Sequence, residues 1–234
     1  MNHVDKTKGF TLIELMLSMT FISILLVAIA VTIIQISNVY NRGITLKEVN
    51  QSGRSLSNEL QRSITSGAPF MIEEGDGSRY VKQEDWGGRL CTGQYSYVWN
   101  FGRALVSNDP GGDRLNVYAD GSDTQIRFVK AVDPSASYCI DSTKKVDKAT
   151  ATELLNVGDH SLALQSFSIE SAASATDAKT RERLYSIVFF IGTNDQAALV
   201  EGGTGCKGPG EDGADLAYCS VQEFNIVARA GSGL

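Results

Sequence analysis

One uncharged run near the N-terminus limits what this chain can fold into. Residues 15–36 carry no charged side chain. Their few polar residues are Ser18, Thr20, Ser23, Thr32 and Gln35. About 20 such residues in a helix cross the hydrocarbon core of a bilayer. Neither proline nor glycine interrupts residues 10–42, so we expect one helix that spans a membrane.

The segment in front of this run does not have the order of an ordinary secretory signal. Lys6 and Lys8 favour a cytoplasmic N-terminus, because positive residues tend to stay on that side. No A-x-A-like cleavage site follows Ile36, and the small residue Gly9 stands before the apolar run. Taken alone, this pattern leaves a plain signal anchor open. Glu14 adds a carboxylate, which costs about 2.5–3.5 kcal/mol at the centre of a membrane helix.

The stretch "KGFTLIELMLSM" (8–19) resembles the class III leader of type IV pilins and type II secretion pseudopilins. The resemblance implies that a prepilin peptidase cuts after Gly9, and that Phe10 becomes the new N-terminus and is N-methylated. It also implies that Glu14 directs assembly by pairing with the Phe10 amine of a neighbouring subunit. An unpaired carboxylate in an apolar layer would penalise wrong registers. The alternative is that Glu14 reaches interfacial water.

The same resemblance implies partners and a location. The partners are the prepilin peptidase and methyltransferase, other pilin subunits in a filament, an inner-membrane assembly platform, and membrane lipid before assembly. The expected protein is a single-pass inner-membrane protein with its N-terminus inside and its head outside. It then joins an extracellular pilus or a periplasmic pseudopilus.

A second apolar pattern follows the span. Residues at steps of three and four predict one face of an amphipathic helix: Leu46, Val49, Gly53, Leu56, Leu60 and Ile64. We expect Gly43 to kink or loosen this helix, and the stretch Gly67-Ala68-Pro69 to end it. A helix from Phe10 to about Ser66 is roughly 85 Å long, so its N-terminal half must project from any head.

The predicted division of the chain has four parts. They are a cleaved leader (1–9), a transmembrane and polymerisation helix (10–36), the amphipathic half of that helix (37–66) and a β-rich extracytoplasmic head (67–234).

The helix also bears on the type of subunit. Major pilins commonly carry a proline at the position of Val31, which this chain lacks. The stretch "KEVNQSGRSLSNELQRSI" (47–64) resembles the helix of PilW-like minor pilins and J-type minor pseudopilins. The predicted function is therefore a structural subunit of a type IV pilus, a minor pilin. The alternatives are a minor pseudopilin of a type II secretion system and a tip adhesin or DNA-uptake pilin.

The rest of the chain predicts strands separated by turns. The expected strands are 95–106, 124–132, 161–171, 183–193 and 220–229. Gly102 suggests a bulge in the first, and the facing parity changes midway in the third. These strands predict an antiparallel sheet, with the long helix on its apolar face. The predicted class is α+β, the pilin fold.

Four cysteines lie in the predicted head: Cys91, Cys139, Cys206 and Cys219. None forms a C-x-x-C pair, which disfavours zinc and thioredoxin-like sites. An extracytoplasmic head favours disulfides, and four cysteines allow three connectivities. We prefer Cys91–Cys139 and Cys206–Cys219. The second pair would close a loop that resembles the disulfide-bounded C-terminal loop of many pilins.

Composition argues against other functions. The net charge of −6 makes nucleic acid an unlikely partner. His160 is the only histidine outside the leader, and no G-x-S-x-G elbow is present, so we expect no enzyme. We expect no cofactor and no metal site. The alternative is calcium, held by the acidic turns with Asp109, Asp113, Asp120 and Asp123.

Overall fold

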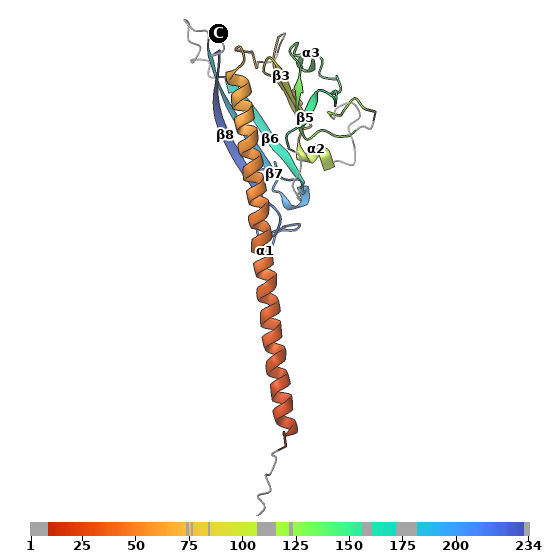
Figure 1. Cartoon of the computed structure of the whole chain (residues 1–234), viewed down its shortest axis with the longest axis vertical. Coiled ribbons are helices and arrows are strands. Elements are labelled where there is room, and N and C mark those ends of the chain that lie inside the picture. Colours follow the sequence, from red (N-terminus) through yellow and green to blue (C-terminus); the bar gives the residue numbers. More distant parts are fainter. Residues whose placement is uncertain are drawn as a thin grey trace, which may run out of the picture.

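A computed structural model shows one long helix that carries a β-rich head at its C-terminal end (Figure 1). The structure describes residues 9–73, 75, 77–83, 85–106, 116–121, 124–155, 161–171 and 182–231. The N-terminal half of the helix projects well beyond the head, as its length predicted. The α+β class predicted from the sequence is confirmed.

The long helix, α1, spans Leu12–Thr65 and has 54 residues. It begins at the N-cap Thr11 and ends at the C-cap Ser66, just before Gly67 and Pro69. The helix continues without a break through Gly43, where we had expected a kink or loosening. A glycine lowers helix stability by about 1 kcal/mol relative to alanine. This cost is small beside the stability that the rest of a 54-residue helix contributes.

The strands form two sheets instead of the one expected. The larger is an antiparallel meander in chain order: β1 (Tyr80–Gln83), β2 (Gly87–Cys91), β3 (Tyr95–Asn100), β4 (Phe128–Val132) and β5 (Ala151–Glu153). Two short helices, α2 (Gly102–Val106) and α3 (Ser137–Ile140), follow β3 and β4 in the chain.

The smaller sheet has three long antiparallel strands: β6 (Leu162–Ser171), β7 (Arg183–Thr193) and β8 (Val221–Ala230). A short 3-10 helix, η3 (Gln196–Ala198), follows β7. The register of β6 against β7 shifts between Leu164 and Ser166. This irregularity accounts for the change of facing parity that the sequence predicted within 161–171.

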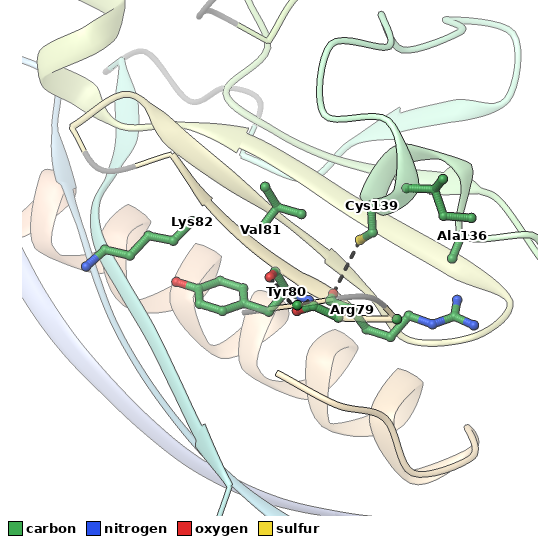
Figure 2. A pocket seen from close by; sticks show the side chains of 10 residues that line it. Arg79, Tyr80, Val81, Lys82, Ala136 and Cys139 are labelled. Atoms are coloured by element: carbon green, nitrogen blue, oxygen red, sulfur yellow. Dashed lines mark hydrogen bonds between the residues drawn. The ribbon is translucent and has the colours of Figure 1, made fainter. Parts of the chain in front are cut away.

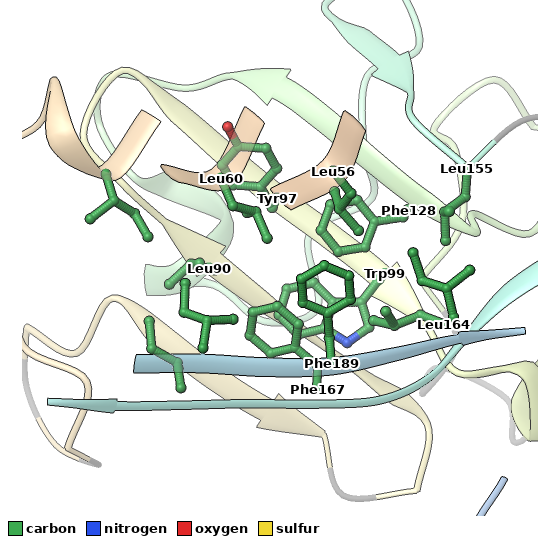
Figure 3. Packing of buried hydrophobic residues seen from close by; sticks show 14 of the residues in the cluster. Leu56, Leu60, Leu90, Tyr97, Trp99, Phe128, Leu155, Leu164, Phe167 and Phe189 are labelled. Carbon is green, nitrogen blue, oxygen red and sulfur yellow. The ribbon is translucent and has the colours of Figure 1, made fainter. Parts of the chain in front are cut away.

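One apolar core joins α1 to both sheets. The stripe Val49, Leu56, Leu60 and Ile64 is at most 1% exposed. In Figure 3, Leu56 and Leu60 lie against aromatic side chains from β3, β4, β6 and β7: Tyr97, Trp99, Phe128, Phe167 and Phe189. Burying each large aliphatic side chain contributes about 1.5–3 kcal/mol. The C-terminal half of α1 is therefore part of the core of the head.

Two details of the sequence prediction were wrong. Leu46 is 41% exposed, and the buried residue at that level is Thr45. Steps of four lead from Thr45 through Val49 to Gly53, so Leu46 lies one position off the buried face. Gly102 does not form a bulge, because β3 ends at Asn100 and Gly102 begins α2.

Candidate functional site: the N-terminal end of the helix and the end of the head from which it projects

Thr11 and Glu14 form a reciprocal cap at the start of α1. The Thr11 backbone N–H donates to Glu14 Oε2 at 2.9 Å, and the Thr11 hydroxyl donates to the same oxygen at 2.7 Å. In return, the Glu14 backbone N–H donates to Thr11 Oγ1 at 3.3 Å. This is a capping box, which satisfies backbone donors that the first helical turn would otherwise leave without partners.

Sequence reasoning did not identify Thr11 as part of the site. The signal was present, since "TLIE" has the T-x-x-E spacing of a capping box. The structure thus gives the Glu14 carboxylate a partner on its own chain. Without such a partner, a carboxylate in an apolar layer would be left with its full cost of desolvation.

The rest of this half of α1 has nothing packed against it in the described part of the chain. Every side chain from Gly9 to Tyr40 is exposed except Ser18, which is half-buried. A helical window in α1 has a mean hydropathy of 2.6 and is 0% buried, so its length and composition would let it cross a membrane. Glu14 lies with Phe10, Leu17 and Phe21 along one shallow face of this helix.

Residues 5–33 match the prokaryotic N-terminal methylation motif. The match covers Gly9, Phe10 and Glu14, and it lies on a long helix whose apolar half is exposed and whose other half enters a β-rich head. This motif is the class III signal of type IV pilins and pseudopilins, and it supports that family for the chain. No curated protein and no solved structure shows significant similarity to the chain.

The motif and the exposed apolar helix fit a membrane-anchored pilin, and the family that the motif marks is structural rather than catalytic. Three residues have roles here that remain predictions: Gly9 and Phe10 in cleavage, Phe10 in methylation and Glu14 in assembly. His160 lies outside the described residues.

The structure joins the cysteines in the pairs that the sequence analysis preferred. Cys91, at the end of β2, is bonded to Cys139 in α3, and Cys206 is bonded to Cys219. The first bond fixes α3 to the five-stranded sheet. The second closes the segment that leads into β8, which we call the disulfide loop (206–219).

The disulfide loop contacts α1 near the point where the helix leaves the head. Asn41 Nδ2 donates to the Tyr218 hydroxyl oxygen at 2.9 Å, across 177 positions of sequence. Asn41 is the first residue of α1 that is not fully exposed after the long exposed segment. The disulfide loop therefore belongs to the end of the head from which the apolar half projects.

A polar cluster also holds α1 on the five-stranded sheet. Glu59 Oε1 accepts from Lys130 Nζ at 2.6 Å and from the Tyr97 hydroxyl at 3.0 Å. The ammonium of Lys130 lies 3.7 Å from the centre of the Tyr95 ring. Burial alone would raise the pKa of Glu59, but the hydrogen bonds from Lys130 and Tyr97 outweigh it and hold that pKa below its usual value.

A pocket of about 440 Å³ lies between β1 and α3 (Figure 2). In Figure 1, α3 lies at the end of the head away from the projecting half of α1, which we call the distal part of the head. Arg79, Lys82 and Ile140 are among the residues that line it. Nη1 of Arg79 is buried and has no hydrogen-bond partner among the described residues. The buried Arg89 differs, because its Nε and Nη2 both donate to Asn116 Oδ1, at 3.1 and 2.7 Å.

The acidic turns considered for calcium are only partly visible. Asp109, Asp113 and Asp123 lie outside the described residues, and Asp120 pairs with Lys148 at 3.2 Å. Within the described ranges no group of three or more histidine, cysteine, aspartate or glutamate side chains is placed to hold a metal ion.

Proposed function

We propose that this chain is a minor pilin, a structural subunit that enters a type IV pilus through the apolar half of α1. The observation that carries the proposal is the form of α1: one unbroken helix, exposed and apolar at one end and buried in the head at the other. A soluble protein rarely leaves so large an apolar surface uncovered. Lipid before assembly, and neighbouring helices after it, would cover that surface.

Processing would precede assembly. In this proposal a prepilin peptidase cuts between Gly9 and Phe10 on the cytoplasmic side, and Phe10 is then methylated. The head would lie outside the cytoplasm, where the two disulfides are stable. The cut leaves Thr11 and Glu14 in place, so the mature helix keeps its capping box.

Glu14 would act at the step of extraction from lipid. Before assembly its carboxylate accepts from Thr11, which lowers the cost of keeping it at the membrane. In the filament it would pair with the Phe10 amine of a neighbour. The carboxylate has two oxygens and can accept several hydrogen bonds, so it can serve the capping box and the new pair together.

Two substitutions separate the charge of Glu14 from its cap. Glutamine also serves at this position of a capping box, so Glu14→Gln keeps the cap and removes the charge, whereas Glu14→Ala removes both. We expect both variants to insert and to be processed, and both to be poorly incorporated into sheared filaments at equal membrane level. Normal incorporation of Glu14→Gln with loss for Glu14→Ala would assign Glu14 to capping alone. Normal incorporation of both would remove the assembly role.

The main alternative is a minor pseudopilin of a type II secretion system, which would share the leader, the helix and the processing. The filament that contains the chain distinguishes the two. A tagged chain should co-purify with sheared extracellular pili if the proposal holds. Recovery only with periplasmic secretion components would favour the pseudopilin.

A second candidate function is adhesion at a filament tip, and the pocket beside Arg79 favours it. A buried guanidinium nitrogen that has no partner among the described residues suits a carboxylate-bearing ligand. Arg79→Ala should then weaken binding of an acidic oligosaccharide such as oligogalacturonate. Arg54→Ala, which removes an exposed arginine from α1, is the matched control and should leave binding unchanged. Equal binding by wild type and both variants would exclude this ligand class at the pocket.

A further inference from the structure

The disulfide loop lies close to where the surface of a bilayer would be. Its Tyr218 hydroxyl accepts from Asn41, only five residues beyond Ile36, the last residue of the uncharged run. Thr45, one turn further along α1, is fully buried. In Figure 1 the loops drawn in blue, between β7 and β8, lie at the end of the head where α1 emerges.

The distances place this contact at the level of the lipid headgroups. The 22 residues from Leu15 to Ile36 make a helix of about 33 Å, which fills a hydrocarbon core of roughly 30 Å. Five further residues carry α1 about 7.5 Å beyond the core. The headgroup layer on one side is about 5–7 Å thick. Asn41 and Tyr218 therefore lie at or just beyond the outer edge of that layer when α1 spans the membrane.

The surface offered at this level suits the interface. Tyr218 is 43% exposed, Leu216 is 48% exposed and Tyr40 is 67% exposed. Tyrosine rings with a polar tip are enriched at membrane–water interfaces, and an exposed leucine gains by leaving water. The exposed side chains of Tyr40, Leu216 and Tyr218 are thus apolar or aromatic.

The charges of the disulfide loop decide which lipid it suits. The loop has one positive residue, Lys207, and three acidic residues, Glu211, Asp212 and Asp215. Two of these carboxylates accept from backbone N–H groups: Glu211 from Gly208, and Asp215 from Ala217 and Tyr218. These hydrogen bonds leave the carboxylates charged, so one lysine against three acidic residues gives the loop a net charge of −2. An anionic surface would therefore repel the loop, and a zwitterionic surface would not.

We propose that the disulfide loop rests on the zwitterionic headgroup layer of the membrane before assembly, through Leu216 and Tyr218. The inference rests on the proposed membrane insertion of α1. The loop then holds the head against the bilayer on one side of the helix. Extraction of the subunit into a filament breaks this contact together with the lipid contacts of the helix.

Three tryptophan variants of the full chain in phosphatidylcholine vesicles test the inference. Leu216→Trp reports the loop, and Phe21→Trp reports insertion of α1. Ile140→Trp, at an 81% exposed position of α3 on the distal part of the head, is the matched control. The quenchers are lipids with a nitroxide on the headgroup or at mid-chain. The signal of the native tryptophans is subtracted with the wild type.

We expect the headgroup quencher to cause a loss of fluorescence from Leu216→Trp and none from Ile140→Trp, and the mid-chain quencher to cause a loss from Phe21→Trp. Replacing part of the phosphatidylcholine with anionic lipid should reduce the loss at Leu216→Trp. Quenching of Phe21→Trp with none at Leu216→Trp overturns the loop contact and leaves insertion standing. Absence of quenching at Phe21→Trp overturns the insertion on which the proposed function depends. Equal quenching of Leu216→Trp and Ile140→Trp also refutes the contact.

Discussion

Gly53 provides a direct test of how α1 packs on the smaller sheet. It lies on the buried stripe of α1, beneath the ring of Phe224 from β8. A Cβ built on Gly53 would lie 2.0 Å from Cζ and 2.1 Å from Cε2 of that ring. Carbon atoms pack at about 3.5–4.0 Å, so the ring would have to withdraw by about 1.5 Å. Gly53→Ala should therefore destabilise the head, although alanine favours the helix.

The size of the effect comes from two opposing contributions. Alanine in place of glycine favours a helix interior by about 1 kcal/mol. Overpacking of a well-filled site costs typically 1–3 kcal/mol. Withdrawal of Phe224 also disturbs its stacking on Phe189, whose ring centre is 5.4 Å away; such pairs contribute about 0.5–1.5 kcal/mol. We expect a net loss of about 1–3 kcal/mol from Gly53→Ala.

Gly43→Ala is the matched control, because a Cβ there meets nothing within 4 Å on the same helix. It should stabilise the protein by about 0.5–1 kcal/mol. The measurement is thermal unfolding of both full-length variants in detergent, followed by near-ultraviolet circular dichroism. At about 2–4 °C per kcal/mol for a head of this size, the two variants should shift Tm in opposite directions.

A double substitution checks the cause. Phe224→Leu removes the ring atoms that the new methyl group would meet. The cost of Gly53→Ala should therefore be smaller in the Phe224→Leu background than in the wild type. The packing argument would be refuted if Gly53→Ala were at least as stable as Gly43→Ala. It would also be refuted if Gly53→Ala cost the same stability in the wild-type and Phe224→Leu backgrounds.

The remaining predictions concern processing, redox state and pH. Gly9→Val should block the peptidase, because a side chain would obstruct access to the backbone, and intact-mass analysis should find the leader attached; a normal mature mass would contradict this. Alkylation of the denatured, unreduced protein should label no cysteine, and labelling of Cys206 and Cys219 would contradict the loop disulfide. The folded pKa of Glu59 lies below its unfolded value of 4.5. As the pH falls, the unfolded state therefore takes up the proton first. The stability that Glu59 contributes is present above pH 4.5 and is lost as the pH falls through the folded pKa. Glu59→Gln should flatten this loss in acid unfolding curves; an unchanged pH dependence would rule out Glu59 as a source.

The parts of the fold that follow from regular spacing could be predicted from the sequence. The ends of α1 lie within two residues of the predicted start and one residue of the predicted end, because the apolar run and the Gly-Ala-Pro stop are local signals. β7 coincides with the predicted strand 183–193, since alternation of apolar and polar residues marks a half-buried strand.

The parts that depend on distant contacts could not be predicted. β2 has the sequence "GGRLC", whose glycines read as a turn, yet all five residues are buried in the sheet. There Gly87 and Gly88 leave room for close approach to the chain at Trp99. The contact of Asn41 with Tyr218 has no signal in either segment, because it depends on how the whole head sits on α1. The capping box at Thr11 differs from these cases, because its T-x-x-E spacing is a local pattern that the sequence contains.

The unbroken course of α1 through Gly43 determines how the head responds to a pull along the helix. A force applied at Phe10 travels along one hydrogen-bonded backbone into the centre of the head, where Leu56, Leu60 and Ile64 are enclosed. No peripheral linker lies between the two, so the head yields only by withdrawing these side chains, at about 1.5–3 kcal/mol each. Under tension the head would therefore unfold only when its own hydrophobic core opens.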